Sequence, residues 1–484
     1  MHRFLLVSLV ICFCLCGQSQ TRPSAPAESD RTTQAPGSVD STAQVSPEAQ
    51  DQPANTSKNK TSVFSTHLLA NRYWVSGQAN FIFQAHGPFH SPYQGTNSFV
   101  GYGETADSRV LTLYTGVKLP GRTEILFDLE ETGGGGLSAA LGLAGFTNLD
   151  VVRNPELGQG VYISRMMIHE TIALSPDAVS NEPNPFNLQS SLPSKRIELR
   201  AGTMSLVDFF DVNAVGSDSH LQFTNWTIDN NGAYDYAADT RGYTFAAIVE
   251  YQSEKFGARF GEALMPTVAN GIDLEWNLTQ ARAENLELEF RPAWFKGLST
   301  YIRPLAYLNH GNMGSYSEAI NAYQQGITPA PDVTLYRHPN TLKQGFGLNL
   351  EQELPAHMRA YFRGGWNEGK HESFCYTEVN DTFSAGLAIE GDRWGRKDDK
   401  IGSAVASNGL STDHRNYLAD GGLGFLLGDG RLSYGREFIS ESFYNAQIWR
   451  GLYGAAQLSV VANPGYNRAR GPAVIPGLRL HVDF

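Results

Sequence analysis

Apolar and polar residues alternate along many segments of this chain from residue 73 onward. Successive side chains of a β-strand point to opposite faces, so this alternation predicts strands with one apolar and one polar face. The same pattern recurs at 109–119, 124–130, 196–200, 286–291 and 359–364. In the clearest segment, 73–84, Ile82 is the exception; the apolar face holds Tyr73, Val75, Gly77, Ala79, Phe81 and Phe83, and the polar face holds Trp74, Ser76, Gln78, Asn80 and Gln84.

Two architectures use strands of this kind. A soluble β-sandwich turns its apolar faces inward, whereas a transmembrane barrel turns them toward lipid and its polar faces toward a wet lumen. The segments here run for about ten to twelve residues, which spans a bilayer at a tilt, whereas sandwich strands average about five or six. Arg and Glu also alternate along the polar faces, as at 196–200. The pattern therefore predicts an all-β protein, a transmembrane antiparallel β-barrel with long external loops.

The last strand supports the barrel. A terminal phenylalanine on an amphipathic strand resembles the signal that the outer-membrane assembly machinery reads. We therefore expect that machinery, and the lipid of the outer membrane, to be partners of this chain. The strand alternates Leu478, Leu480, Val482 and Phe484 with Arg479, His481 and Asp483.

Short connections set the number of strands. If both ends of the folded chain face the periplasm, seven periplasmic turns imply sixteen strands. Asp429-Gly430 is an eighth hairpin signal, which we interpret as a hairpin inside an external loop; as a membrane turn it would raise the count to eighteen. The seven candidate turns lie at Pro120-Gly121, Pro193-Ser194, Glu254-Lys255, Phe295-Lys296, Pro355-Ala356, Asp392–Trp394 and Arg450-Gly451.

The N-terminus has the features of an export signal, because a basic start, an apolar run ending at Cys16 and small polar residues follow one another. We expect residues 1–19 to be a cleaved signal peptide, with a lipid anchor on Cys14 or Cys16 as the alternative. Residues 20–63, rich in Thr, Pro and Ala, predict a disordered linker, and the barrel domain is expected over 64–484. Cys375 is then the only cysteine of the mature chain, so no intramolecular disulfide is expected. The signal peptide and the barrel together predict that the protein is located in the cell outer membrane of the Gram-negative type.

Composition narrows the choice of function. The 484 residues include 37 Lys and Arg against 49 Asp and Glu, for a formal net charge of −12. An acidic chain without a basic run argues against a nucleic-acid partner. Beyond the N-terminal run, no segment is apolar over the roughly 18 residues that a membrane helix needs, which excludes a helical membrane protein.

Several segments, taken together and in order, resemble the carbohydrate-selective porins of the OprB family. The likeness covers roughly residues 70 to 484. That resemblance implies a sixteen-stranded outer-membrane barrel through which sugars diffuse passively into the periplasm, without chemistry. Its expected solutes are mono- or oligosaccharides. Whether several barrels associate into a homo-oligomer is left open by the resemblance. The segments are Gly133–Gly136, Ala144–Phe146, Asp150–Arg153, Gly202–Asn213, Gln222–Trp226, Gly232–Tyr236 and Asn463–Pro472, followed by Gly477–His481 and Phe484.

Strand parity and the resemblance place eleven candidate solute-binding residues at the lumen or its constriction. A sugar has apolar ring faces and hydroxyl edges, so aromatic rings can stack on it while Arg, Asp and Glu bind its hydroxyls. Walls of mixed sign also avoid strong selection for either sign of ion. The loop between Gly133 and Gly160 could fold inward as the constriction. The candidates are Glu124, Asp128, Glu130, Arg165, His169, Arg196, Glu198, Arg200, Asp208, Asp211 and Trp226, with the three arginines expected to face Glu124, Asp128 and Glu198.

No enzymatic activity, cofactor or metal is expected. Ser407–Ser411 resembles part of the outer-membrane phospholipase motif, but Val405 stands where that enzyme needs its histidine base. His169-Glu170 begins like a zinc-protease motif, but Ala173 stands where the second metal ligand is required. The sequence leaves open whether an acidic external loop binds calcium. The alternative function is a non-conducting or general-diffusion barrel with a binding or structural role.

Overall fold

The computed structural model describes residues 68–152, 157 and 160–484. The predicted signal peptide, 1–19, and the predicted linker, 20–63, lie outside these residues. Within the described ranges no helix has the length and apolar character needed to cross a membrane.

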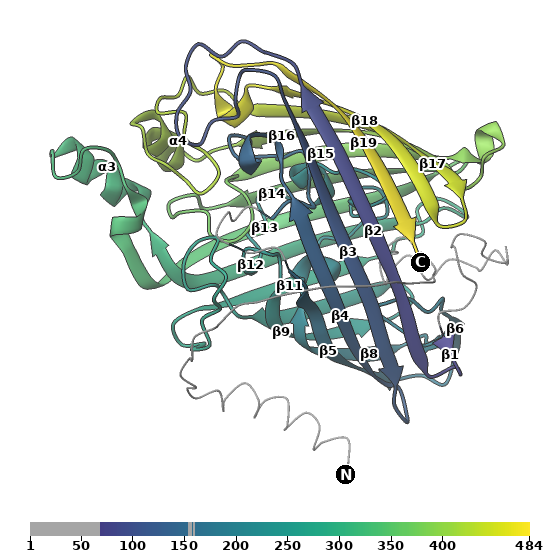
Figure 1. Ribbon diagram of the computed structural model, residues 1–484. Helices are drawn as coiled ribbons and strands as arrows, with labels where there is room; N and C mark the ends of the chain where they lie inside the picture. Colours follow the sequence, from purple (N-terminus) through teal and green to yellow (C-terminus); the bar gives the residue numbers. More distant parts are fainter. Residues whose placement is uncertain (1–67, 153–156, 158–159) are drawn as a thin grey trace, which may run out of the picture.

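Sixteen long antiparallel strands close into one barrel (Figure 1). The last strand pairs with the first, residues 477–483 against 78–84, so the sheet has no open edge and its backbone hydrogen bonds are satisfied internally. The strands are β2 (Tyr73–His86), β3 (Glu104–Lys118), β4 (Thr123–Gly134), β5 (Tyr162–Ala173), β8 (Arg196–Met204), β9 (Thr244–Gln252), β10 (Phe256–Ala263), β11 (Arg282–Phe290), β12 (Thr300–Gly314), β13 (Arg337–Leu354), β14 (Met358–Asn367), β15 (Asp381–Glu390), β16 (Lys400–Gly409), β17 (Glu437–Trp449), β18 (Leu452–Ala462) and β19 (Ala473–Asp483).

Smaller elements decorate the barrel. The short strand β1 (Leu68–Leu69) pairs with β2, and β6 (Ala178–Ser180) forms a separate hairpin with β7 (Ser191–Pro193). The helices α2 (Trp226–Asp229), α3 (Tyr316–Gln324) and α4 (Thr412–Ala419) all lie in loops. Single 3-10 turns occur at Leu137–Ala140, Leu206–Asp208, Val333–Tyr336, Gly391–Trp394 and Pro464–Tyr466.

The predicted alternation of faces is confirmed in β2. Phe81 and Phe83 point outward and are 42% and 46% exposed, whereas Asn80 and Ile82 between them point inward and are 0% and 2% exposed. Apolar residues therefore cover the outside of the barrel and mainly polar residues line the inside, an arrangement typical of transmembrane barrels.

The turns explain the strand count. Each of the seven predicted turns falls between two consecutive barrel strands; the one at Pro193-Ser194 belongs to a longer connection that includes the β6–β7 hairpin. Asp429-Gly430 lies in the loop between β16 and β17, so it adds no membrane strands and the count is sixteen.

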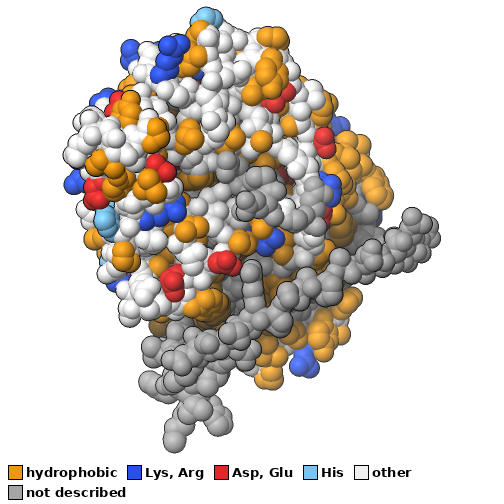
Figure 2. All heavy atoms as spheres, turned by 60° about the vertical axis from the view of Figure 1, so that its left-hand side comes forward, with side chains coloured by type: hydrophobic (Ala, Val, Ile, Leu, Met, Phe, Trp, Pro, Cys, Tyr) orange, Lys and Arg blue, Asp and Glu red, His pale blue; other side chains and the backbone are white. Residues whose placement is uncertain are grey.

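The loops at the other end of the barrel pack into its lumen. Loop residues Leu143, Phe146, Leu206, Phe210 and Phe223 are all fully buried and belong to one hydrophobic cluster with inward-facing strand residues. Figure 2 brings the left-hand side of Figure 1 forward and shows charged side chains of both signs scattered over that face. The core of this protein thus lies inside the barrel, between the wall and the loops.

Candidate functional site

The loop that follows β4 folds inward over its described residues. Glu437 on β17 accepts the backbone N–H groups of Ala144 and Gly145, at 3.2 and 2.8 Å. Gln84 on β2 donates to the carbonyl of Thr147 at 2.7 Å. These bonds tie the loop to β17 and β2, which only β18 and β19 separate in the barrel, and fix the position of Asp150, a few residues further on.

A second loop, residues 205–243 between β8 and β9, crosses the lumen. Glu441 on β17 accepts the backbone N–H groups of Thr224 and Asn225, at 2.8 and 2.9 Å. From β14, Arg363 donates to the backbone carbonyls of Ile228 and Asp211, at 2.8 Å each. Because a buried carboxylate or guanidinium must have partners, these wall residues hold the loop in one conformation.

An aromatic wall consists of Trp226 and Tyr236 from the crossing loop and Tyr376 from another loop. The rings of Trp226 and Tyr376 stack with centroids 5.4 Å apart and an interplanar angle of 11°. Tyr236 lies 4.8 Å from Tyr376. Asn225 caps α2 by accepting the N–H of Thr227 at 3.0 Å, which sets the direction in which Trp226 leaves the helix.

Tyr376 reaches this wall from a different loop, residues 368–380 between β14 and β15. The carboxylate of Asp235 accepts the N–H groups of Phe374, Cys375 and Tyr376 at 2.8 to 3.1 Å. Lys343 on β13 lies 2.9 Å from the same carboxylate and neutralises it. The hydroxyl of Tyr376 donates to the carbonyl of Trp226 at 2.5 Å, so the two loops are joined directly.

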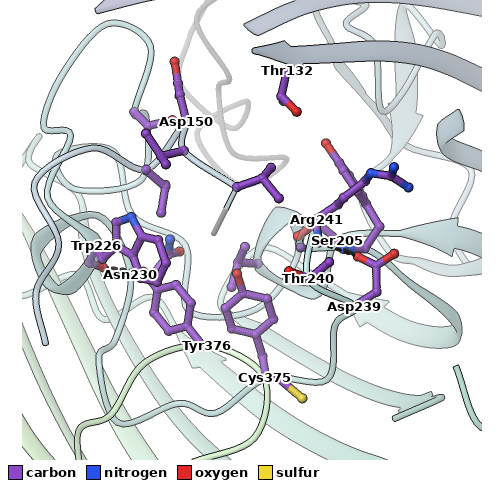
Figure 3. A pocket seen from close by; sticks show the side chains of 18 of the residues that line it. Thr132, Asp150, Ser205, Trp226, Asn230, Asp239, Thr240, Arg241, Cys375 and Tyr376 are labelled. Carbon is purple, nitrogen blue, oxygen red and sulfur yellow. Dashed lines mark hydrogen bonds between the residues drawn. The ribbon is translucent and has the colours of Figure 1, made fainter. Parts of the chain in front are cut away.

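The aromatic wall borders a cavity of about 190 Å³ inside the barrel (Figure 3). Trp226, Asn230 and Tyr376 lie on one side in that view, and Asp239 and Arg241 lie on the other. The lining comes from the two inward loops, from residues 368–380, and from β3, β4 and β5, with Asn270, Phe425 and Leu426 added from two further loops. Residues far apart in the sequence therefore meet at one place in the lumen.

Hydroxyl and charged groups from the barrel wall face the aromatic rings across this cavity. Glu130 accepts hydrogen bonds from the hydroxyls of Tyr162 and Tyr243, at 2.6 and 2.9 Å. Arg165 binds Asp208 through two hydrogen bonds of 2.7 Å each, a bidentate geometry that fixes the plane of the guanidinium. The cavity thus combines flat apolar surfaces with preorganised donors and acceptors.

An ion pair between two loops completes the lining. The imidazole of His220 lies 3.3 Å from Asp150, and Asn80 donates to the same carboxylate at 2.5 Å. Burial disfavours both charges, yet His220 and Asn80 lower the pKa of Asp150 below its usual range. In the same way, Asp150 raises the pKa of His220 in spite of burial. A charged pair therefore joins the two inward loops at the cavity.

Four of the eleven residues singled out from the sequence line this cavity: Glu130, Arg165, Asp208 and Trp226. The other seven are buried, and none of them belongs to its described lining. Asp128 lies 3.8 Å from Arg165, and Asp211 lies 2.8 Å from Arg363.

The remaining five belong to an ion-pair ladder along the inner wall, which we define as Glu124, His169, Arg196, Glu198, Arg200, Glu250, Arg259 and Glu287. His169 lies between Glu124 and Glu198, at 3.1 and 3.0 Å. Arg196 binds Glu198 at 2.5 Å, and Arg200 joins Glu198 to Glu250. Arg259 continues from Glu250 to Glu287, at 3.1 and 2.5 Å. The ladder runs from β4 to β11, and its charges are satisfied mainly by one another. The expected pairing of Arg196 and Arg200 with Glu198 is present, but the ionisable partner of Glu124 is His169.

Several lining residues were not among the sequence candidates, namely Asp150, Tyr162, His220, Asp229, Tyr236, Asp239, Arg241, Tyr243 and Tyr376. Most of them lie in loops, where strand parity gives no information about side-chain direction. The available signal was the density of Asn, Asp and aromatic residues in 225–243, which is unusual for an exposed loop.

The profile of the carbohydrate-selective porin, OprB family, matches residues 102–484 of the chain. Among solved structures, the high-pH structure of Pseudomonas putida OprB superposes with a TM-score of 0.65 at 15% sequence identity, covering 86% of this chain and 95% of that one. Pseudomonas aeruginosa OccK11 (OpdR) follows with a TM-score of 0.41 at 10% identity, covering 86% of this chain and 97% of that one. No curated protein sequence matches the chain.

Proposed function

The chain belongs to the carbohydrate-selective porin, OprB family, and from this premise we propose that it lets mono- or oligosaccharides diffuse passively across the outer membrane into the periplasm. The solute passes through the lumen and binds transiently in the cavity between the inward loops. Diffusion is driven by the sugar gradient alone, so the protein needs neither a cofactor nor a catalytic group.

One observation carries the proposal at the level of residues: the stacked rings of Trp226 and Tyr376 face hydroxyl and charged groups across a cavity inside the closed barrel. The C–H faces of a sugar ring pack on an aromatic ring, while its hydroxyls exchange hydrogen bonds with groups at the edge. Glu130 offers an acceptor, and Arg165, whose Nε and Nη2 are bound to Asp208, offers its Nη1 donors in a fixed plane. Each contact is individually weak, which a pore requires because the solute must also leave.

We assign different roles to the eleven sequence candidates. Glu130, Arg165, Asp208 and Trp226 line the cavity and are proposed to contact the solute or to orient a group that does. Asp211 holds the Arg363 side chain in place at 2.8 Å, whereas Asp128 lies 3.8 Å from Arg165, beyond hydrogen-bond distance. Glu124, His169, Arg196, Glu198 and Arg200 belong to the ion-pair ladder, and we propose that they keep the wall polar and in register.

The partners and the route to the membrane are part of the same proposal. The apolar outer face of the barrel contacts outer-membrane lipid. Residues 1–19 are proposed to direct export and to be cleaved, and the final strand ending in Phe484 is proposed to bind the assembly machinery. Association of barrels into a homo-oligomer is compatible with this arrangement and would leave each lumen separate.

Liposome swelling and planar-bilayer conductance of the purified protein test the proposal. Sugars should enter liposomes faster than amino acids of similar size, and they should reversibly block single-channel current. Trp226→Ala should weaken sugar block about tenfold, as expected if stacking contributes roughly 1 to 2 kcal/mol.

Trp294→Ala is the matched control. Trp294 lies in the connection between β11 and β12, is 65% exposed and does not line the cavity. A protein that conducts ions without sugar block would be a general-diffusion pore. A protein that conducts nothing would have a binding or structural role. Either result would contradict the proposal.

A further inference from the structure

The charge on the wall of the cavity is not balanced. Its described lining includes five carboxylates and two guanidiniums, the latter being Arg165 and Arg241. Arg165 is engaged with Asp208, and His220 pairs with Asp150. Three carboxylates therefore face the cavity with one guanidinium left to oppose them, although the barrel strands themselves mix both signs. The three are Glu130, Asp229 and Asp239.

Two of these carboxylates are held by uncharged donors. Glu130 accepts from the hydroxyls of Tyr162, Tyr243 and Thr112, at 2.6, 2.9 and 3.1 Å. Asp239 accepts the backbone N–H groups of residues 241 and 243, at 2.8 and 3.1 Å. Such donors stabilise a carboxylate without cancelling its charge, and the low-dielectric walls of a narrow lumen focus the resulting field on the solute.

Asp229 has a free acceptor beside the aromatic wall. Its side chain is part of the cavity lining, the residue is only 4% exposed, and Oδ1 has no hydrogen-bond partner among the described residues. The other oxygen, Oδ2, accepts from Asn230 at 3.0 Å. A buried acceptor without a donor costs free energy, so this atom identifies the place where a donor on a solute would be most favourable.

The neighbours of Asp229 specify the kind of donor. Asp229 ends the short helix α2 that Trp226 begins, and Trp226 stacks on Tyr376. An ammonium group next to a carboxylate and the faces of aromatic rings gains a charge-assisted hydrogen bond and a cation–π attraction together. A neutral hydroxyl gains only an ordinary hydrogen bond there, and an anionic group is repelled.

We propose that this cavity favours sugars that carry an amino group over neutral sugars, and neutral sugars over those that carry a carboxylate or a phosphate, with the ammonium group seated between Asp229 and the aromatic wall. This inference rests on the proposed passage of sugars through the same cavity. Burial also raises the pKa of Asp229 well above its usual range, against the lowering influence of the Arg363 charge. An ammonium group seated beside Asp229 lowers this pKa again, so binding of the amino sugar releases the carboxyl proton to water.

Sugar block of single-channel current tests the order of preference in the unmodified protein. The probes are glucosamine, N-acetylglucosamine, glucose and glucuronate, compared at neutral pH, where most of the glucosamine amine is protonated and Asp239 has lost its proton. Glucosamine should block at about one tenth of the concentration that N-acetylglucosamine requires, because one charge-assisted hydrogen bond replaces a neutral one. Glucuronate should block least.

A substitution then locates the preference. Asp229→Asn keeps the shape and one acceptor but cannot become a carboxylate beside an ammonium group, so the ratio of glucosamine to glucose block should fall close to one. Glu254→Gln is the matched control, because it removes the same charge from an exposed turn between β9 and β10 and should leave that ratio unchanged.

The outcomes separate this inference from the proposed function. If glucose blocks the pore but glucosamine blocks it no better, the amino-sugar preference is wrong while sugar passage stands. If Asp229→Asn retains the full preference, the ammonium group is not seated at Asp229. If no sugar blocks at all, the proposed function itself fails. The comparison of probes in the unmodified protein remains decisive even if the Asp229 variant does not fold.

Discussion

Gly77 and Phe484 exchange two backbone hydrogen bonds, from Gly77 N–H to the Phe484 oxygen at 2.7 Å and from Phe484 N–H to the Gly77 oxygen at 2.8 Å. The phenyl ring also lies over Gly77, since a Cβ atom at position 77 would lie 2.6 Å from Cε2 of Phe484. The glycine therefore makes room for the terminal ring at the seam where β19 meets β2.

Gly77→Ala should weaken this seam. The added methyl group would collide with the Phe484 ring and with the carbonyl oxygen of Thr112, 2.8 Å away, and overpacking of this kind costs about 1 to 3 kcal/mol. The measurement is the urea concentration at which the barrel unfolds. Gly87→Ala, where a Cβ atom meets nothing within 4 Å, should leave that concentration unchanged. Equal midpoints for the two variants would show that the seam tolerates the methyl group.

Deletion of Phe484 should reduce the amount of folded barrel in the outer membrane. The deletion removes both backbone bonds to Gly77 and the proposed assembly signal, but no residue of the cavity. Quantitative comparison of boiled and unboiled membrane samples measures the folded fraction. The barrels that do fold should keep the single-channel conductance of the unmodified protein. An unchanged folded fraction would argue against a role in assembly.

Arg165→Lys should weaken sugar block about tenfold and leave ion selectivity nearly unchanged. A lysine keeps the charge, but it cannot reproduce the two parallel hydrogen bonds to Asp208 or the planar fork that they orient. Arg165→Glu should instead shift the reversal potential in a salt gradient toward cation preference.

Arg196→Lys and Arg200→Lys are informative comparisons, since these two arginines lie in the ion-pair ladder and outside the cavity lining. They should destabilise the barrel by roughly 1 to 3 kcal/mol while affecting sugar block less than Arg165→Lys. If all three lysine variants block like the unmodified protein, the aromatic wall alone carries recognition.

Cation selectivity should increase as the pH rises through about 6. Burial raises the pKa of Asp239 to about 6, against the lowering influence of the backbone N–H groups of residues 241 to 243 and of the Arg241 charge. Above that pH the carboxyl loses its proton and adds a negative charge to the cavity. The folded protein holds this proton more tightly than the unfolded chain does. Ionisation of Asp239 therefore also reduces stability, between pH 3.8, its ordinary pKa, and about 6.

Reversal potentials measured across this pH range test the prediction, with Asp239→Asn as the reference. The difference between the two proteins isolates Asp239 from the other ionisable residues of the lining, such as His220, Asp150 and Asp229. Identical curves would show that Asp239 does not contribute to the field in the pore.

The strands and the cavity differ in how far the sequence predicts them. Alternation fixes the face of each residue in β2 because the neighbouring strand imposes a regular pleat, and a turn such as Pro120-Gly121 marks where the chain reverses. The direction of Trp226 has no such local determinant. It depends on Glu441, more than two hundred positions later in the chain, and on Tyr376, one hundred and fifty positions later.

The same distinction explains the candidate residues. The alternation along the strand correctly predicts that Glu198 and Arg200 point inward. An inward direction does not tell whether a side chain contacts the solute or another wall residue. Glu198 meets His169, Arg196 and Arg200, so it belongs to the ladder. Glu130, on the same kind of strand, reaches the cavity because the inward loops leave space in front of it.

The loop of residues 205–243 also has a mechanical consequence. It is bonded to β14 through Arg363, to β17 through Glu441 and, through Arg479, to β19, where Arg479 donates to the carbonyls of Ser219 and Gln222 at 2.9 Å. A hollow tube of sheet flattens readily under sideways load, whereas close-packed protein matter hardly compresses. The loop therefore acts as a cross-brace, and the bore of the channel is set by the span of this brace instead of by the pressure of the surrounding bilayer.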